Sequence, residues 1–475
     1  VGALTSRPYA FTVRPWELNK TESIDVMDAV GSNIRVDARG AQVMRVLPRL
    51  NEDVNEEWIS DKTRYAIDGL RRQRLDRPYA RGRDGKLHPI SWDEALKTLA
   101  GKLGKAKAKR VAAIAGDQCD AESMFALKSL MARIGSPNLD CRQDGAKIVA
   151  ARSGYLFNST IAGIDDADAL LIIGSNPRVE AAVLNARIRR NWLATQMPVG
   201  VIGENADLTY ATQWLGDEAS VLDDVLSGTN KFAAKLKKAK RPMIIIGMGA
   251  LVRADGVSVL GKARQIAETY GVVTEKWNGF NILHTAAARV AGLDMGFLPD
   301  RGGMDIAAMA AAAKAGSLDV LWSLGADEID YADFASSFVI YQGHHGDAGA
   351  HHADIVLPGA AYTEKDGIYL NTEGRVQYAN RAAFPPGEAR EDWAIIRAVS
   401  GAIGKSIGMN SLAEVRDALC EALPHFAMPD QIGTAKWAKF GGRAKLTSQP
   451  ITSPIKNFYM TCAISRASET MAECR

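Results

Sequence analysis

The chain has 475 residues, enough for about three domains at the usual ~150 residues per domain. Hydrophobic residues make up 47% and charged residues 24% of it, which is ordinary for a globular protein. The 58 basic and 55 acidic residues leave a net charge of +3, and this balance argues against a nucleic-acid partner or an anionic membrane surface.

Apolar runs and cysteines exclude two further classes of protein. No apolar run approaches the ~18–20 residues of a membrane-spanning helix, and the chain does not open with the basic and apolar segments of a secretory signal. The cysteines are Cys119, Cys141, Cys420, Cys462 and Cys474. Their odd number and the lack of a C-x2-C pair predict reduced thiols in a reducing compartment.

Residues 21–90 are expected to form a small β-rich domain. Ile34–Val36 and Val43–Leu47 flank a turn at Ala38-Arg39-Gly40, and this pattern predicts a β-hairpin. Ser91 to Glu94 has the spacing of a capping box, so a helix should begin there and open the next domain.

Residues 91–435 repeatedly place a short apolar run before a glycine. The runs are Val111–Gly116, Ala169–Gly174, Val199–Gly203, Met243–Gly247, Val320–Gly325 and Ile355–Gly359. Because helix-length segments separate them, the pattern predicts an α/β body with doubly wound, mostly parallel sheets. Residues 436–475, with Pro450 and Pro454, predict an extended C-terminal tail that needs another surface to become ordered.

The spacing Asp25-x2-Asp28-x3-Ser32, followed by Ser60-x-Lys62, is an unusual feature of the first domain. It resembles the C-x2-C-x3-C and later C-x-K spacing of iron–sulfur sites in molybdopterin-type oxidoreductases, with every cysteine replaced. Cluster iron prefers thiolates, and carboxylates and hydroxyls are hard, poor replacements. We therefore interpret the four positions as vestigial cluster positions that bind no metal.

A second candidate is the loop Gly174-Ser175-Asn176-Pro177 at the expected carboxyl end of a strand, where doubly wound sheets bind ligands. Similar loops in related molybdenum enzymes bind the pterin nucleotide, but an ordinary strand-to-helix turn also explains the residues. A molybdenum ligand would fall shortly after Cys141, where Asp144 is the one residue able to bind metal. We expect a vestigial pterin-type loop and no active molybdenum site.

The chain also contains a histidine cluster, formed by His344, His345, His351 and His352. Imidazoles at such spacing can bind zinc or a similar metal. The stretch also contains glycines and precedes a predicted strand, so a loop with hydrogen-bonding or exposed histidines is the favoured interpretation. No nucleophile–base arrangement can be singled out, and no catalytic residue is assigned.

Several segments together resemble the large iron–sulfur subunit of respiratory NADH:quinone oxidoreductase, complex I. They are Val1–Thr5, Arg14–Leu18, Thr21–Asp25, Asn55–Arg64, Ile173–Arg178, Ala353–Gly359, Thr363–Gly367, Asn371–Gln377, Asn457–Thr461 and Ile464–Ser468. Their order and extent cover essentially the whole chain. The resemblance implies a molybdopterin-oxidoreductase-like fold in which residues 21–90 correspond to a 4Fe–4S domain that has lost its cluster ligands.

In that family an N-terminal region carries the ligands of one 2Fe–2S and two 4Fe–4S clusters. This chain is expected to begin just after the last of those ligands, as a fragment or the product of a split gene, with residues 1–20 as a remnant. The resemblance therefore implies no cofactor in this chain, and clusters in the missing region.

The resemblance also implies a role. Complex I oxidises NADH, reduces quinone and pumps protons; this portion would be a structural scaffold in its peripheral arm. Its partners would be other peripheral-arm subunits, including the NADH-binding flavoprotein subunit. It would lie peripherally on the inner membrane, on the cytoplasmic side in bacteria or the matrix side in mitochondria. The alternative is a free-standing molybdopterin-dependent oxidoreductase or its apo-form binding module.

Overall fold

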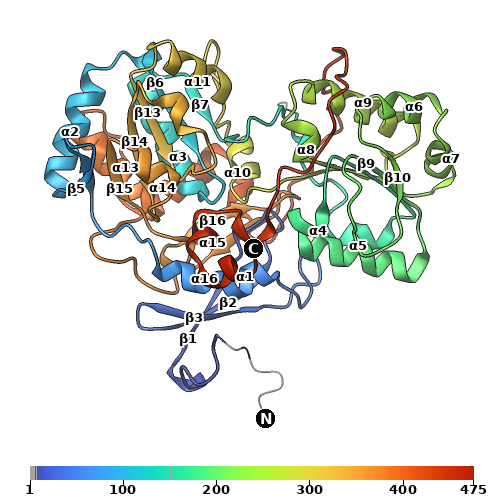
Figure 1. The fold of residues 1–475 in the computed structure, drawn as a ribbon, viewed down its shortest axis with the longest axis horizontal. Coiled ribbons are helices and arrows are strands. Elements are labelled where there is room, and N and C mark those ends of the chain that lie inside the picture. Colours follow the sequence, from blue (N-terminus) through green and yellow to red (C-terminus); the bar gives the residue numbers. More distant parts are fainter. Residues whose placement is uncertain (1–5, 7, 149–150) are drawn as a thin grey trace.

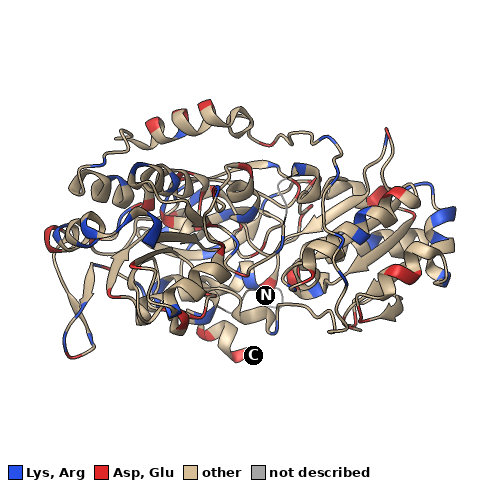
Figure 2. Cartoon of the chain, turned by 90° about the horizontal axis from the view of Figure 1, so that it is seen from above, with Lys and Arg blue, Asp and Glu red and all other residues tan. Residues whose placement is uncertain are grey.

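A computed structural model of the chain describes residues 6, 8–148 and 151–475. Two α/β lobes lie side by side, and a small antiparallel sheet lies below the junction between them (Figure 1). Val1–Thr5 and part of the expected remnant at residues 1–20 lie outside the described residues. Lys and Arg are interspersed with Asp and Glu over both lobes, as the near balance of charge predicts (Figure 2).

The small sheet follows the order β1-β2-β3, and its strands are antiparallel. The strands are β1 (Asn19–Ile24), β2 (Asn33–Arg39) and β3 (Gln42–Pro48). The predicted hairpin is confirmed as β2 and β3, and Gly40 adopts a φ of +60° in the turn between them, which a glycine accepts without strain. One face of the sheet packs on α1 (Asp61–Tyr65) and the 3-10 helix Ala66–Arg71.

The larger lobe contains a seven-stranded sheet in the order β5-β4-β15-β14-β13-β6-β7. Its strands are β4 (Tyr79–Arg81), β5 (Leu87–Pro89), β6 (Val111–Ala115), β7 (Asn138–Asp140), β13 (Val320–Leu324), β14 (Phe338–Gly343) and β15 (Ile355–Pro358). The strands from β15 to β7 are parallel, whereas β4 and β5 form an antiparallel edge. Residues 79–89 thus extend the large sheet, which corrects the expectation that the small β-rich domain continues to residue 90.

Helices cover the seven-stranded sheet. They are α2 (Trp92–Lys105), α3 (Ala121–Ile134), α10 (Arg289–Asp294), α11 (Ile306–Lys314), α12 (Ala348–His352), α13 (Asp392–Ala402) and α14 (Leu412–Ala422). The predicted capping box is confirmed at the start of α2. The Ser91 hydroxyl accepts from the Glu94 amide, and the Glu94 carboxylate accepts from the Ser91 amide at 2.9 Å. This exchange satisfies two amides that the first turn of a helix leaves free.

The second lobe is an insertion between β7 and β13. Its five-stranded sheet is parallel throughout, in the order β10-β9-β8-β11-β12. The strands are β8 (Ala169–Ile173), β9 (Val199–Ile202), β10 (Gln213–Gly216), β11 (Pro242–Gly247) and β12 (Phe280–Leu283). The helices are α4 (Pro177–Glu180), α5 (Ala182–Thr195), α6 (Val221–Ser227), α7 (Lys231–Lys238), α8 (Met248–Leu251) and α9 (Gly256–Thr269). The predicted doubly wound, mostly parallel α/β architecture is confirmed.

The last part of the chain returns to the centre. The strands β16 (Gly367–Leu370) and β17 (Val376–Ala379) form a separate antiparallel pair. After α14 the chain passes over the five-stranded lobe and ends in α15 (Ala463–Ala467) and α16 (Glu469–Glu473), which pack beside α1 (Figure 1). No helix among the described residues is long and apolar enough to span a bilayer.

The fully buried indole of Trp322 in β13 predicts a measurable stability cost. Trp322→Ala should lower the free energy of unfolding by about 3–5 kcal/mol, because the surrounding core cannot close the resulting cavity. Trp16→Ala is the matched control, since the Trp16 side chain is 80% exposed and its removal should change little. Urea unfolding followed by circular dichroism measures both, and an equal loss in the two variants would contradict the prediction.

Candidate functional site

The four predicted cluster positions lie together on the small domain. Asp25, Asp28 and Ser32 occupy the turn between β1 and β2, which the Asp25 amide closes by donating to the Ser32 carbonyl at 2.9 Å. Ser60 is the N-cap of α1, and its side-chain oxygen accepts from the Thr63 amide. All four residues are buried.

Hydrogen bonds within the chain engage these side chains. The Thr63 hydroxyl donates to Asp25 Oδ2 at 2.8 Å and lies 2.7 Å from the Ser60 hydroxyl, so it connects the two positions. Asp25 Oδ1 accepts from the Met27 amide at 3.1 Å. Asp28 Oδ1 accepts from the Val30 amide at 2.9 Å. Since the oxygens are hard ligands and several already have partners, this donor set does not fit a 4Fe–4S cluster.

The carboxyl groups at these positions are difficult to ionise. Burial, together with the nearby negative charge of Asp28, raises the pKa of Asp25 to about 7, against the hydrogen bonds from Thr63 and Met27. Burial also raises the pKa of Asp28, and the ammonium group of Lys62 opposes this rise. A proton therefore lowers the cost of burying the pair.

A crevice of about 230 Å³ lies where the two lobes meet the small domain. Asp117 follows β6, Glu328 follows β13 and Glu180 lies in α4 after β8, so the crevice is at the carboxyl ends of strands from both sheets. Ligands of doubly wound folds bind at this end of the strands. Asp144 lines it as well and pairs with Arg289 of α10 at 2.9 Å.

The predicted pterin-type loop lies beside this crevice. Gly174 has a φ of +61°, and a Cβ there would lie 2.5 Å from the Ala250 amide nitrogen, so this close turn requires glycine. Glu180 engages the loop: the Ser175 hydroxyl donates to it at 2.6 Å and the Asn176 amide donates at 2.9 Å. The carboxylate thus lies where an anionic group of a ligand would be held by the same donors.

The carboxyl groups of the crevice are compensated in different ways, since Asp144 pairs with Arg289 and Glu328 pairs with Arg466. Burial, together with the charge of Glu328, raises the pKa of Asp117 to about 7, whereas Arg289 opposes this rise. Burial likewise raises the pKa of Glu180. The only lysine that lines the crevice among the described residues is Lys62, whose ammonium donates to the Thr461 hydroxyl at 2.7 Å. Carboxyl groups thus outnumber lysines in the crevice lining, and burial shifts those of Asp117 and Glu180 toward the protonated form.

Comparisons with known proteins agree with this architecture. Residues 74–402 match the family model of molybdopterin oxidoreductases, residues 18–68 the NDSU1/NuoG-like 4Fe-4S domain of NADH-ubiquinone oxidoreductase, and residues 431–474 the C-terminal domain of the G subunit of that enzyme. The G subunit of NADH-quinone oxidoreductase from Rickettsia felis is 47% identical over 475 residues, which cover the whole of this chain and 69% of that protein. The chain belongs to the NuoG-like family of NADH-quinone oxidoreductase subunits.

Two further comparisons bear on the family and on the fold. The 78 kDa mitochondrial subunit of NADH-ubiquinone oxidoreductase from Neurospora crassa is 47% identical over the whole chain and 64% of its own length. Acetylene hydratase from Pelobacter acetylenicus shares the fold, with a TM-score of 0.65 at 14% identity over 88% of this chain and 74% of its own. The predicted complex I membership and the molybdopterin-oxidoreductase-like fold are confirmed. This chain is a subunit of an oxidoreductase complex.

The family models also refine the expectation about cofactors. A domain of the 4Fe–4S type lies within this NuoG-like chain at residues 18–68. The match therefore does not support the expectation that this chain holds no cofactor, and the absence of a cluster is a proposal taken up below.

The structure separates the four candidate histidines into two pairs. His344 and His345 follow β14 in the interior, with their Nδ1 atoms 2.5 Å apart, and His345 Nε2 lies 2.8 Å from the Gly69 carbonyl, to which it donates. Burial lowers the pKa of His345 to about 4. His351 and His352 are exposed at the end of α12. Across the described ranges, no three His, Cys, Asp or Glu side chains are grouped to hold a metal ion.

Sequence reasoning missed most residues of the crevice. Asp117 and Glu328 follow Gly116 and Gly325 closely, so their places just after predicted strand ends carried a usable signal. Glu180 carried none, since its partner Ser453 is 273 residues away along the chain. Asp144, in contrast, had been identified, and it lies in the crevice as a salt-bridge partner.

The raised pKa of Asp25 predicts a pH-dependent stability difference. An unfolded aspartate loses its proton near pH ~3.9, whereas folded Asp25 keeps it up to about pH 7. The folded state therefore binds the extra proton, and its stability falls as pH rises through this window. Asp25→Asn should thus gain stability relative to the unsubstituted chain, on the order of 2–4 kcal/mol, between about pH 4 and about pH 8.

Urea unfolding at several pH values measures this difference. Asp417→Asn, at an exposed position on α14, is the control and should show no such trend. A difference for Asp25→Asn that stays constant over this range would contradict the prediction.

Proposed function

We propose that this chain serves as a structural scaffold in the peripheral arm of complex I and carries no redox centre of its own. The observation that supports the proposal is that groups of the chain itself engage the candidate cluster positions and the candidate pterin-type loop. Asp25 and Ser60 are hydrogen-bonded through Thr63, and Glu180 engages the pterin-type loop. The family's redox clusters would then lie in the N-terminal region of the longer subunit.

The chemistry of the first site supports the absence of a cluster from the domain at residues 18–68. Cysteine thiolates bind cluster iron through soft sulfur, and none of the cysteines lies between residues 18 and 68. Asp25, Asp28, Ser32 and Ser60 supply oxygen atoms only, and the buried Asp25 favours its protonated form. A protonated carboxyl group is a still poorer ligand for iron.

The crevice is equally unsuited to a pterin dinucleotide. Phosphates bind to cations and N–H donors, whereas the carboxyl groups of Asp117, Asp144, Glu180 and Glu328 line the crevice and Glu180 already accepts from the donors of the loop. The crevice volume of about 230 Å³ is below the ~300 Å³ at which ligand pockets usually begin. We therefore infer that Gly174, Ser175, Asn176 and Pro177 are a vestigial loop.

A scaffold needs surfaces for its partners. We propose that its partners are the other peripheral-arm subunits, including the NADH-binding flavoprotein subunit. The chain would be attached to the membrane only through the complex, on the cytoplasmic side in bacteria or the matrix side in mitochondria. Exposed large apolar side chains that such partners could cover are Phe11, Trp16, Trp58, Leu193 and Phe384. We propose that the chain is divided into three structural units, which are the small β domain, the α/β body and the C-terminal tail.

Elemental analysis distinguishes this proposal from the alternative of a free-standing molybdopterin oxidoreductase. The full chain, purified from cells supplied with molybdate and tungstate, should contain neither metal in stoichiometric amount. Stoichiometric molybdenum or tungsten would refute the scaffold role. A catalytically competent molybdenum enzyme purified from the same cells provides the positive control.

Activity of the assembled complex gives a second test. Asp28→Asn keeps the acceptor for the Val30 amide and removes the carboxylate, so complex I that contains this variant should retain its NADH:quinone activity per assembled complex. Trp322→Ala should instead reduce the amount of complex that assembles, because it weakens the fold. A loss of activity per assembled complex with Asp28→Asn would contradict the proposal.

A further inference from the structure

We propose that the surface where the two lobes meet the small domain is a peptide-binding site, and that the chain's own C-terminal segment, residues 450–471, is its ligand and forms one wall of the crevice. The proposal goes beyond the scaffold role, because it concerns how this segment is held and does not depend on whether another subunit is bound. The segment passes from the five-stranded lobe to the small domain (Figure 1). Its contacts divide into four groups.

The first group fixes the segment to the five-stranded lobe. Ile451 is fully buried, and its amide donates to the Asp217 carbonyl at 2.7 Å. The Arg253 guanidinium donates to the Pro450 carbonyl at 3.0 Å. The Ser453 hydroxyl donates to Glu180 Oε1 at 2.6 Å, which places this residue on the same carboxylate that engages the pterin-type loop.

The second group lies at the wall of the crevice. The segment contributes four lining residues, Pro454, Ile455, Thr461 and Cys462. Lys62 donates to the Thr461 hydroxyl, and its ammonium lies 5.1 Å from the centre of the Phe458 ring, within the range of a cation–π contact. Lys62 of the former cluster motif thus binds the segment through both a hydrogen bond and an aromatic ring.

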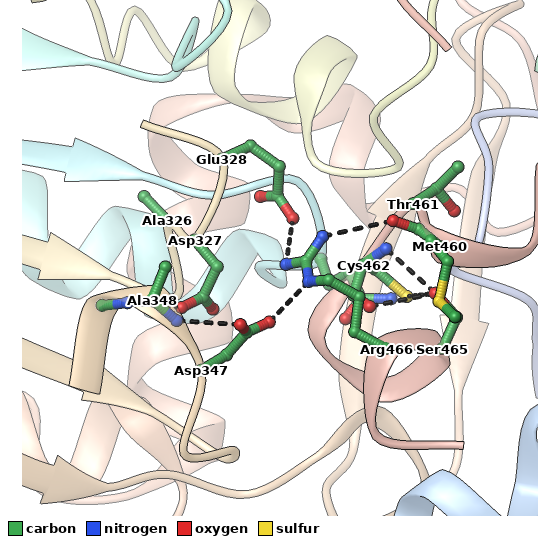
Figure 3. Close-up of polar contacts among 12 residues, drawn as sticks. Ala326, Asp327, Glu328, Asp347, Ala348, Met460, Thr461, Cys462, Ser465 and Arg466 are labelled. Carbon is green, nitrogen blue, oxygen red and sulfur yellow. Dashed lines mark hydrogen bonds and ion pairs between the residues drawn. The ribbon is translucent and has the colours of Figure 1, made fainter. Parts of the chain in front are cut away.

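The third group joins the segment to the seven-stranded lobe. Arg466 of α15 lies between two carboxylates, as Figure 3 shows. Its Nη2 donates to Glu328 Oε1 at 2.8 Å, and its Nε donates to Asp347 Oδ2 at 2.7 Å. Asp347 is the N-cap of α12, and Glu328 lies beyond the carboxyl end of β13. One guanidinium thereby bridges two elements of that lobe, and charge-assisted bonds of this kind are strong.

The fourth group anchors the end of the segment on the small domain. Ile464 is fully buried in the same apolar cluster as Val36 and Val46 of the small sheet. A Cβ at Gly69 would lie 2.0 Å from the Ile464 carbonyl oxygen, so the backbones pack closely there. The Thr470 amide donates to Asp68 Oδ2 at 3.1 Å.

These contacts explain how a segment that contains only short helices is held. It makes hydrogen bonds or apolar contacts with both lobes and with the small domain, and Arg466 pairs with the carboxylates of Glu328 and Asp347. Because the contacts are spread over three parts of the chain, a peptide with the same side chains should bind there when the covalent connection is broken.

A cleavable full chain tests the proposal. A site-specific protease sequence is inserted between Ala444 and Lys445, in an exposed stretch, and the folded protein is cut after purification. The C-terminal fragment should elute with the rest of the chain in size-exclusion chromatography and separate in denaturant. Its exchange against an excess of a fluorescent synthetic peptide of residues 445–475, followed by anisotropy, gives the dissociation rate.

Three substitutions make the result specific. Arg466→Ala should speed dissociation about tenfold or more, because two charged hydrogen bonds are lost. Asp347→Asn can still cap α12 and should speed dissociation less than Arg466→Ala. If Arg466→Ala does not fold, Asp347→Asn is used in its place. Arg397→Ala, which removes an exposed arginine whose side chain donates to Asn410, is the matched control and should have no effect.

Two results would overturn the proposal. One is immediate loss of the fragment from the cleaved, otherwise unsubstituted chain in native buffer. The other is a dissociation rate that is the same in Arg466→Ala, Asp347→Asn and Arg397→Ala.

Discussion

Charge buried between the three parts of the chain must find its partners within the chain, and the rest of the structure depends on this constraint. An unpaired charge in such a place costs several kcal/mol, so each one is paired or protonated. The buried Arg289 pairs with Asp144, and burial raises the pKa of Asp25 to about 7. At the partly exposed edge of the crevice, Glu328 pairs with Arg466 and joins the seven-stranded lobe to the C-terminal segment. The hydrogen bond from Ser453 to the buried Glu180 joins the same segment to the five-stranded lobe.

The same constraint applies to the candidate ligand sites of the fold. The fold of a molybdopterin oxidoreductase presents backbone donors and a crevice at the carboxyl ends of its strands. In this chain, Glu180 takes the donors of the loop after β8, and Thr461 receives the ammonium of Lys62. These internal contacts, under the proposed function, stand in place of contacts to a ligand. Under the proposed function, the architecture persists because neighbouring subunits require its shape.

Local signals allowed much of the fold to be predicted. Apolar runs followed by glycine identified the buried parallel strands, and Ser91 with Glu94 identified the start of α2. The edge hairpin β4–β5 was misplaced, because its pairing with β15 joins residues far apart in sequence. The residues that meet around the crevice could not be predicted for the same reason, since Arg466 contacts Glu328 across 138 residues. Spacing reveals which residues follow a strand, whereas tertiary packing decides which of them meet.

The central claim is that protein groups replace the metal cofactor at Asp25, Asp28, Ser32 and Ser60, and electron paramagnetic resonance tests it most directly. The full chain is purified without oxygen after expression with excess iron and sulfide, and it is then reduced with dithionite. The account predicts no iron–sulfur signal from this chain. The signal of a reduced tetranuclear cluster, in proportion to the protein, would contradict it.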